Sequence, residues 1–462
     1  MRIALETAAH PIEACLPHHG LSYRFVRRLR RREINCNVGY RWNVTMLFQK
    51  IGKNLFEGRL LQVSFTYLIR AIDKFLGNIA RFFYAKLVRV NSKQIFFISF
   101  QGDFTCNPKY IANRLLQENA DCKMVFSTRR HSLNTPGAFP EGAKLVKQYS
   151  ADYYKELAKS HIIIANSVEF FKKQTPLKKS QILIETWHGS LGIKRFDASV
   201  NSGRTWVEAA TRCGRRCDYI ISNSAFEDMV YQTSFWPNTP IWRFGHPRND
   251  ILFGDHSLLR EQVYRTILDY EANQAGMAEP LEQPPDVHYL LYGPTFRDNH
   301  KLDHYLQDFT GLREALAERF GGTWKILVRL HPTVRKMAGK YLKAHSDVID
   351  VTVYPDIQEL MMVSDAAITD YSSWIYDFVL TGRPGFLYAP DIHDYEGERG
   401  FYYPLSSTPF PLAATDIELS RNIRSFDEAA YRDRVEKFLK DKGCMEDGHA
   451  SERVVEQLKQ LL

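Results

Sequence analysis

From about residue 94, the chain consists of short apolar runs separated by stretches with helical periodicity. The first set of apolar runs predicts strands at 94–100, 123–127, 161–167, 182–189 and 219–224. After a polar, proline-containing stretch at 271–287, a second set predicts strands at 288–294, 324–332, 348–352, 366–373 and 385–390. Continuous apolar strands that alternate with helices are typical of parallel sheets covered on both faces. We therefore predict an α/β fold in which two Rossmann-like domains face each other across a cleft.

The first 94 residues follow a different pattern. Within 60–90, polar residues recur at steps of three and four between Leu, Ile and Phe, which gives a wide apolar face with a narrow basic stripe. The segment RFVRRLRRR at 24–32 adds six arginines. A basic amphipathic helix can lie in the headgroup region of an anionic leaflet, where each Lys or Arg adds about 1 kcal/mol. The alternatives are an ordinary helix packed on the body and, for the arginines, a nucleic-acid arm. We predict a membrane-associating region and no nucleic-acid partner, because no aromatic-rich binding module accompanies the arginines.

The distribution of charge supports this division. The 462 residues carry a formal charge of +8, but residues 1–95 hold 17 Lys and Arg against 5 Asp and Glu, and the remainder holds 44 against 48. The slightly acidic body argues against a protein-wide nucleic-acid surface. Length and composition fit two or three globular domains, for which we predict the boundaries 1–94, 95–275 and 276–462.

The seven cysteines are scattered and form no Cys-x-x-Cys pair. No signal peptide is evident, and no apolar run reaches the roughly 18 residues that a spanning helix needs. These features predict a cytosolic chain with reduced thiols.

Polar motifs follow several predicted strands directly, at the edge where open parallel sheets bind ligands. His188, in Trp-His-Gly, is placed to accept a proton from a hydroxyl near neutral pH. Its alternative role is that of a buried structural histidine beside a turn. Arg329 and His331 follow another strand and suit a diphosphate; the alternative there is a solvated basic loop.

Two further motifs after predicted strands also suit an anionic ligand. Ser372 and Ser373 stand where a strand turns into a helix, so their hydroxyls and the free amides of the first turn could bind phosphate without a metal. Thr295 and Arg297 follow a Gly-Pro turn. The alternatives are a simple serine N-cap and a surface arginine.

Signals for other chemistries are weak. His300 and His304, and likewise Cys213 and Cys217, have helical i, i+4 spacing without an obvious third metal ligand. No Asp-x-Asp, Walker A, Gly-x-Ser-x-Gly or Gly-x-Gly-x-x-Gly motif occurs. We therefore expect no metal or other cofactor, and we disfavour hydrolase, P-loop and dinucleotide-oxidoreductase functions.

Taken together, the motifs resemble the CDP-glycerol glycerophosphotransferase family, the teichoic-acid primases and polymerases. In chain order they are ISFQGDFTCNPKYI (98–111), ETWHGSLGIKRFD (185–197), ISNSAFE (221–227), GHPRNDIL (245–252), YGPTFRD (292–298), VRLHP (328–332), DIQELMMVSDAAITDYSSWIYDF (356–378), GRP (382–384), RGFYY (399–403) and DGHASERV (447–454). The resemblance covers about residues 95–460. It implies a glycosyltransferase-B fold and transfer of a polyol phosphate from CDP-glycerol or CDP-ribitol to a hydroxyl of a lipid-linked or polymer acceptor, with CMP leaving. It also implies peripheral attachment to the cytoplasmic face of the cell membrane.

The resemblance also implies roles for individual residues. His188 matches the family's general base, and the domain at 95–275 that carries it would be the acceptor side. The domain at 276–462 would bind the CDP donor through His331, Thr295, Arg297, Arg329, Ser372, Ser373 and Asp370. Two departures from the family pattern concern the acceptor and the polyol: His246 replaces an aromatic residue, and Ser-Leu-Gly follows His188 in place of Thr-Pro-Leu.

Two competing functions remain. One is a sugar transferase of the same fold that uses a UDP or GDP donor, and the other is a non-enzymatic membrane-bound scaffold. The sequence does not decide whether the donor carries glycerol or ribitol, or whether the protein primes or extends a polymer. It also leaves open whether the product is a teichoic acid or a capsule, and what the oligomeric state is.

Overall fold

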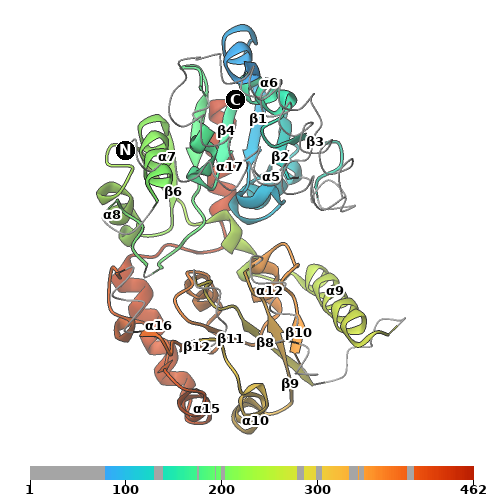
Figure 1. Cartoon of the computed structure of the whole chain (residues 1–462), viewed down its shortest axis with the longest axis vertical. Coiled ribbons are helices and arrows are strands. Elements are labelled where there is room, and N and C mark those ends of the chain that lie inside the picture. Colours follow the sequence, from blue (N-terminus) through green and yellow to red (C-terminus); the bar gives the residue numbers. More distant parts are fainter. Residues whose placement is uncertain are drawn as a thin grey trace, which may run out of the picture. The chain divides into compact units, whose positions relative to one another are not determined.

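The computed structural model of the chain describes residues 79–129, 139–173, 176–192, 194–198, 203–277, 286–297, 304–331, 342, 348–392 and 400–462. These residues lie within one compact unit, Asp73–Leu462 (Figure 1). The arginine-rich segment at 24–32 and most of the amphipathic segment at 60–90 fall outside the described residues. The described end of that segment, 79–87, is helical, as predicted.

The first sheet has seven parallel strands in the order β3-β2-β1-β4-β5-β6-β7. Their bounds are β1 Asn91–Ile98, β2 Lys123–Thr128, β3 Lys144–Lys147, β4 Ser160–Ala165, β5 Ile182–Glu185, β6 Tyr219–Ser222 and β7 Ile241–Arg243. Five of the seven coincide with predicted strands. The edge strands β3 and β7 were not predicted, because they are short and mostly half-exposed or exposed and so carry little apolar signal.

The second sheet has six parallel strands in the order β10-β9-β8-β11-β12-β13. Their bounds are β8 Val287–Tyr292, β9 Thr323–Val328, β10 Val348–Asp350, β11 Ala366–Thr369, β12 Gly385–Tyr388 and β13 Leu412–Ala413. In each sheet the chain builds outward from a central strand in one direction and then in the other, so the order reverses between β1 and β4 and between β8 and β11. In such folds ligands bind outside the carboxyl ends of the strands at this reversal. The predicted pair of parallel-sheet α/β domains is confirmed.

Helices cover both faces of the sheets. The α-helices are α5 Cys106–Gln117, α6 Ala151–Lys159, α7 Arg204–Arg216, α8 Ala225–Thr233, α9 Ser257–Ala275, α10 Phe309–Phe320, α12 Ile357–Val363, α13 Ile375–Phe378, α15 Asp416–Arg424, α16 Glu428–Lys442 and α17 Ala450–Leu461. Short 3-10 helices are η2 Phe100–Gly102, η4 Val168–Lys173, η5 Pro247–Leu252, η7 Val379–Thr381 and η8 Leu405–Ser407. Because apolar side chains pack on both faces, the strands read as continuous apolar runs.

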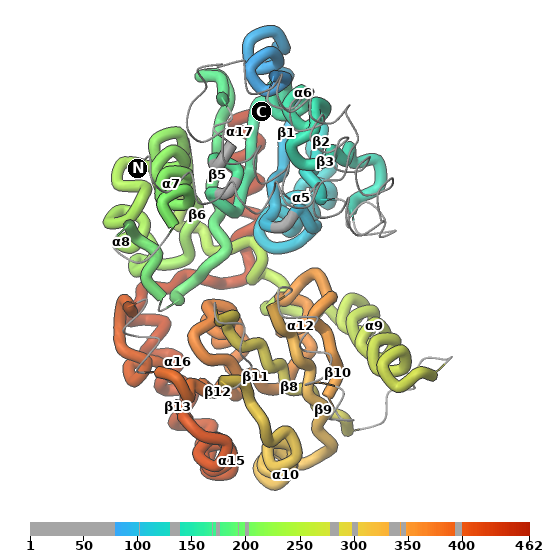
Figure 2. Tube along the Cα trace, viewed as in Figure 1, coloured from blue at the N-terminus to red at the C-terminus, as the bar shows by residue number. Residues whose placement is uncertain are grey.

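The last helix returns to the first sheet. Val454, Val455 and Leu458 of α17 are fully buried in the same apolar core as Ile95 and Phe97 of β1. Figures 1 and 2 show α17, in red, beside β1 and β4. The segment 276–462, predicted as one domain, therefore includes a helix that completes the core of the other sheet.

Buried polar contacts connect elements of the first sheet to the second. Lys109 of α5 donates to Asp356, with 2.8 Å between Nζ and Oδ2, and the Tyr110 hydroxyl lies 3.1 Å from the same oxygen. Arg248 of η5 pairs with Asp377 of α13 at 2.9 Å. These contacts bring the carboxyl ends of strands from both sheets toward a common region.

Candidate active site

His188 follows β5 and is held by residues that follow β4 and β1, the next two strands on one side of β5 in the sheet. Its Nδ1 lies 2.6 Å from the backbone oxygen of Asn166, directly after β4. Since a carbonyl oxygen only accepts hydrogen bonds, Nδ1 of the neutral ring carries the proton and Nε2 keeps its lone pair. The ring of Phe100, after β1, stacks on the imidazole with centroids 5.3 Å apart and planes 12° apart. The exposed imidazole is therefore held in one orientation, with Nε2 as its basic atom.

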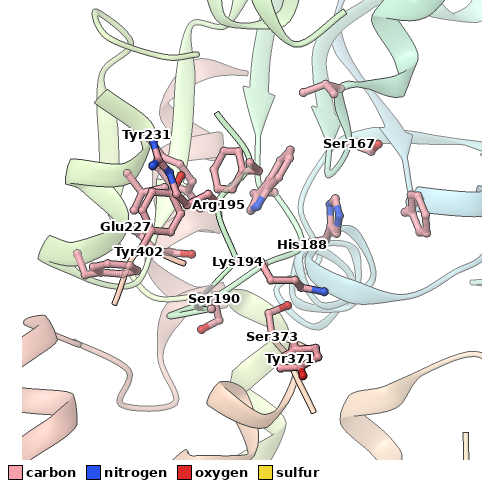
Figure 3. Close-up of a pocket in the computed structure, with 18 of the residues that line it drawn as sticks. Ser167, His188, Ser190, Lys194, Arg195, Glu227, Tyr231, Tyr371, Ser373 and Tyr402 are labelled. Carbon is pink, nitrogen blue, oxygen red and sulfur yellow. The ribbon is translucent and has the colours of Figure 1, made fainter. Parts of the chain in front are cut away.

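A pocket of about 400 Å³ adjoins His188. Its lining is largely aromatic and includes Phe100, Trp187, Phe196, Trp206, Phe226, Tyr231, Tyr371 and Tyr402. Polar and charged residues also line it, namely Ser167, His188, Ser190, Lys194, Arg195, Glu227 and Ser373. In the view of Figure 3, Lys194 lies between His188 and Ser373. The pocket thus combines the predicted base with one of the two serines predicted to bind the donor phosphate.

A glycine permits this approach of the two loops. A Cβ added at Gly192 would lie 2.8 Å from the Cβ of Ser373, closer than side-chain carbons come in proteins. The Tyr403 hydroxyl donates a hydrogen bond to the backbone oxygen of Leu191 in the same loop. The loop after His188 therefore packs directly on the turn that carries Ser373.

The loop after β8 is fixed by an ionic network. The backbone N–H of Thr295 donates to Asp370, with 2.9 Å from N to Oδ1. Arg297 is buried between two carboxylates, with 2.8 Å from Nη1 to Oδ2 of Asp370 and 2.7 Å from Nε to Oδ2 of Asp391. Burial alone would lower the pKa of Arg297, but the two carboxylates outweigh it and raise the pKa above its usual value. Asp370 and Arg297 thus hold the loop in place, and direct contact of either with the donor stays a prediction.

Two hydroxyl groups near this loop, those of Tyr371 and Thr295, differ in their hydrogen bonding. The Tyr371 hydroxyl donates to Asp391 at 2.9 Å. The Thr295 hydroxyl oxygen is buried and has no hydrogen-bond partner within the described part of the chain. Of the residues in this loop, Thr295 therefore has a polar side-chain atom to offer a ligand.

Arg329 and His331 follow β9. Arg329 donates through Nη2 to the backbone oxygen of Tyr354 at 3.2 Å, and its buried Nε has no partner among the described residues. Burial lowers the pKa of Arg329, although the charges of Asp356 and Asp103 oppose this effect. Partial burial and the positive charge of Arg329 lower the pKa of the exposed His331, so its ring is neutral at pH 7. A weakly compensated cation next to a neutral imidazole suits an anionic ligand.

The predicted site residues therefore form more than one group. His188 and Ser373 share the pocket, whereas the described residues that line it do not include Thr295, Arg297, Arg329, His331, Asp370 and Ser372. The charge of Asp103, three residues after Phe100, acts on Arg329 and opposes the effect of burial on its pKa. Ser372 and Ser373 are half-buried and precede α13, a helix of one turn. Their contact with a donor phosphate stays a prediction.

His246, where the family pattern has an aromatic residue, lies in a buried polar cluster. Its Nε2 lies 2.9 Å from Oε2 of Glu227, a residue that lines the pocket, and its backbone N–H donates to Glu446 at 3.0 Å. Burial raises the pKa of Glu446 to about 7. The departure at this position therefore places a buried imidazole and two carboxyl groups behind the pocket wall.

Several residues of the site were not predicted from the sequence. They are Phe100 and Asn166, which orient His188, and Arg248, Tyr371 and Asp391, which hold the loops around it. Asn166 is the second-last residue of the predicted strand 161–167, HIIIANS, and its position near a strand end was the available signal.

The candidate metal pairs gain nothing from the structure. His300 lies outside the described residues. Cys213 and Cys217 are buried, and burial raises the pKa of both thiols. Among the described residues, no group of three His, Cys, Asp or Glu side chains is arranged to hold a metal ion.

Comparison with known proteins identifies relatives. The sequence model of the family described as CDP-Glycerol:Poly(glycerophosphate) glycerophosphotransferase matches residues 80–460. The teichoic acid poly(glycerol phosphate) polymerase of Staphylococcus epidermidis is 29% identical over 386 residues, which are 79% of this chain and 50% of that protein. The teichoic acid ribitol-phosphate primase of Bacillus spizizenii is 26% identical over 409 residues, which are 86% of this chain and 98% of that protein.

A solved structure of the wall teichoic acid polymerase TagF is also similar. It superposes with a TM-score of 0.67 at 27% identity and covers 87% of this chain and 98% of that one. The chain spans about half the length of the poly(glycerol phosphate) polymerases of S. epidermidis and Bacillus subtilis, 50% in each case. The match of the family model over nearly the whole described unit confirms the predicted resemblance: the chain belongs to the CDP-glycerol:poly(glycerophosphate) glycerophosphotransferase family.

Proposed function

We propose that this protein transfers glycerol phosphate, or a related polyol phosphate, from a CDP-activated donor to a hydroxyl of a growing teichoic-acid-like or capsular polymer. The observation that carries the proposal is the orientation of His188. Its Nδ1 is bound to the Asn166 carbonyl, so Nε2 carries the lone pair that can take a proton, beside a pocket that Ser373 also lines. Membership of the family supports the same reaction.

The transfer replaces one phosphorus–oxygen bond by another. The acceptor oxygen attacks the phosphorus that bears the polyol, and its proton passes to Nε2 of His188. The bond between that phosphorus and the bridging oxygen then breaks, and CMP leaves with the electron pair. A positioned base of this kind contributes about 10²–10⁴-fold to the rate.

The donor side must offset the negative charge that grows on CMP. Arg329 is suited to this task because backbone carbonyls and distant carboxylates compensate its charge only in part. His331, Ser372, Ser373 and the Thr295 hydroxyl would add hydrogen bonds to the donor phosphates. Arg297 and Asp370 would keep the Thr295 loop in place. We expect this set to act without a metal, in the glycosyltransferase-B arrangement of acceptor and donor domains.

One assay tests the proposal. The purified protein is incubated with CDP-glycerol or CDP-ribitol and a lipid-linked acceptor, with and without EDTA, and products are sized by mass spectrometry. We expect CMP release, a mass increase of one or more polyol phosphate units, and activity in EDTA. Release of UDP or GDP from a sugar donor would assign the competing transferase function, and no release from any donor would favour a scaffold. Full loss in EDTA that Mg²⁺ restores would refute the metal-free scheme.

A membrane surface is proposed as the second partner. One side of the helix at 79–87 carries four apolar side chains that are 51–63% exposed, namely Ile79, Phe82, Phe83 and Leu87. Arg81, Lys86 and Arg89 stand beside them in the sequence. Exposed apolar side chains flanked by cations fit an anionic leaflet. None of the helices in the described residues is long and apolar enough to span a bilayer. We propose peripheral attachment to the cytoplasmic face, where a lipid-linked acceptor would reside.

A further inference from the structure

Two buried side chains hold the peptide groups on either side of His188. Asn107 donates through Nδ2 to the backbone oxygens of Thr186, at 2.9 Å, and Trp187, at 3.3 Å. Arg248 donates through Nη2 to the backbone oxygen of Gly189 at 2.5 Å. The two holders are themselves joined, because the backbone N–H of Arg248 donates to Oδ1 of Asn107 at 3.1 Å.

The turn that carries His188 needs this support. Trp187 has a φ of +51°, in the left-handed region that a bulky side chain rarely adopts. Such a backbone costs on the order of 1–3 kcal/mol and persists only where surrounding contacts over-determine it. Without its holders, the turn would relax, and the imidazole would move with it.

The other end of Arg248 is bound to the second sheet. Its Nε lies 2.9 Å from Oδ2 and its Nη2 3.3 Å from Oδ1 of Asp377, so the pair is bidentate, and both side chains are almost fully buried. Asn249 and Gln358 also donate to this carboxylate, at 3.1 and 3.2 Å. Asp377 lies in α13, four residues after Ser373.

One guanidinium therefore joins the turn that carries the base to the short helix behind the serines. Arg248 binds the Gly189 carbonyl and the Asp377 carboxylate at the same time through its planar fork, a geometry that a lysine ammonium cannot reproduce. An ion pair that only stabilised the fold would need no contact of Arg248 beyond Asp377. Arg248 also binds the backbone oxygen of Gly189, the residue next to His188, and this contact connects the ion pair to the proposed base.

We infer that Arg248 is a positioning residue for phosphate transfer, which fixes the His188 turn relative to the Ser372–Ser373 turn. The inference rests on the proposed function. In-line transfer needs the base, the attacking oxygen and the phosphorus aligned, and a displacement of about 1 Å can cost about 100-fold in rate. Arg248 would supply that alignment without touching either substrate.

The test compares Arg248→Lys in two backgrounds. We expect R248K to lower kcat by about 10- to 100-fold, with KM for the CDP donor within about threefold of the wild-type value. In a His188→Gln protein, where no base remains to be positioned, R248K should cost less than about threefold. An equal loss in both backgrounds would show a merely structural role and overturn the inference.

Two further variants keep the result interpretable. Asp377→Asn preserves the side-chain shape and should give the same background-dependent loss, so it replaces R248K if that variant does not fold. Lys325→Met breaks the partly buried pair with Glu271, 2.6 Å long, and should leave kcat unchanged. If the wild-type protein transfers polyol phosphate and R248K turns over at the normal rate, the inference about Arg248 is overturned while the proposed function stands. A wild-type protein that released no CMP would overturn the proposed function and the inference with it.

Discussion

Glu185, the last residue of β5, gives the sharpest quantitative prediction. Its carboxyl group is fully buried behind the turn that carries His188. It accepts hydrogen bonds from the Trp187 N–H at 3.0 Å and from the Cys213 thiol at 3.6 Å. Burial raises the pKa of Glu185 to about 8, and the two hydrogen bonds offset only part of that effect. The folded protein therefore holds this carboxyl group neutral at pH 7.

The sign of the stability effect follows from linkage. A carboxyl group whose pKa is higher in the folded than in the unfolded state binds its proton more tightly when folded, so the free energy of unfolding falls as pH rises between the two pKa values. The unfolded value is 4.5 and the folded value about 8. At about 1.4 kcal/mol per pH unit, the wild-type protein loses about 3 kcal/mol through this group between pH 5 and pH 7.5.

Glu185→Gln removes the titration and keeps an oxygen that accepts from the Trp187 N–H. We expect the stability of E185Q relative to the wild type to increase by about 3 kcal/mol over that pH range and to level off above pH 8. Urea unfolding at half-unit pH steps measures the difference. The matched control is Glu156→Gln. Burial would raise the pKa of Glu156, but Lys144, 2.6 Å away, and Gln94 outweigh it and lower the pKa. That variant should instead lose stability relative to the wild type as pH rises toward 4.5, the unfolded value, and change little above it. A pH-independent difference for E185Q would refute a neutral buried carboxyl group.

Three further predictions concern function. His188→Ala should lower kcat by about 10²–10⁴-fold, to the residual rate without a base, while CDP-glycerol binding, measured by calorimetry, stays within about threefold, because the base contacts the acceptor; near-normal turnover would remove it as the base. Gly192→Val should lower kcat by at least about tenfold, because a side chain there collides with Ser373 and separates the loops; unchanged kinetics would show that their contact is dispensable. Phe83→Ser should weaken sedimentation with anionic vesicles by about tenfold or more, since an exposed Phe contributes about 1.5–3 kcal/mol when buried in an interface. Ile417→Ser, at a site 82% exposed on the second sheet's side of the chain, is the control and should bind normally; equal binding by both variants would reject attachment through this helix.

The sequence located the candidate site because two local signals coincide. Apolar runs mark strands, and ligand sites in parallel sheets follow strand ends, so His188, Thr295, His331 and Ser373 could be selected from their neighbours alone. The chemistry of each residue depends on partners far away in the chain. His188 is oriented by residues after β1 and β4, and which strands neighbour β5 is a matter of strand order that apolar periodicity does not encode.

The ion-pair partners of charged residues are likewise not predictable from the local sequence. Arg297 reads as a cation for phosphate in the sequence, but Asp391, 94 residues later, neutralises it together with Asp370. Nothing in the sequence of the Gly-His-Pro-Arg motif indicates a partner for Arg248, which proves to be buried against Asp377. Neither pairing follows from local spacing, because both partners are set by how separate elements pack.

The packing of α17 under the first sheet has a consequence for biosynthesis. The core that surrounds Ile95 and Phe97 of β1 receives Val454, Val455 and Leu458 of α17, which are made more than 350 residues later. A ribosome making about 5–20 residues per second would leave the earliest sheet waiting for tens of seconds with one apolar face uncovered. During that interval the apolar face of the first sheet would be exposed, and a nonsense mutation just before α17 would damage the sheet that is made earlier.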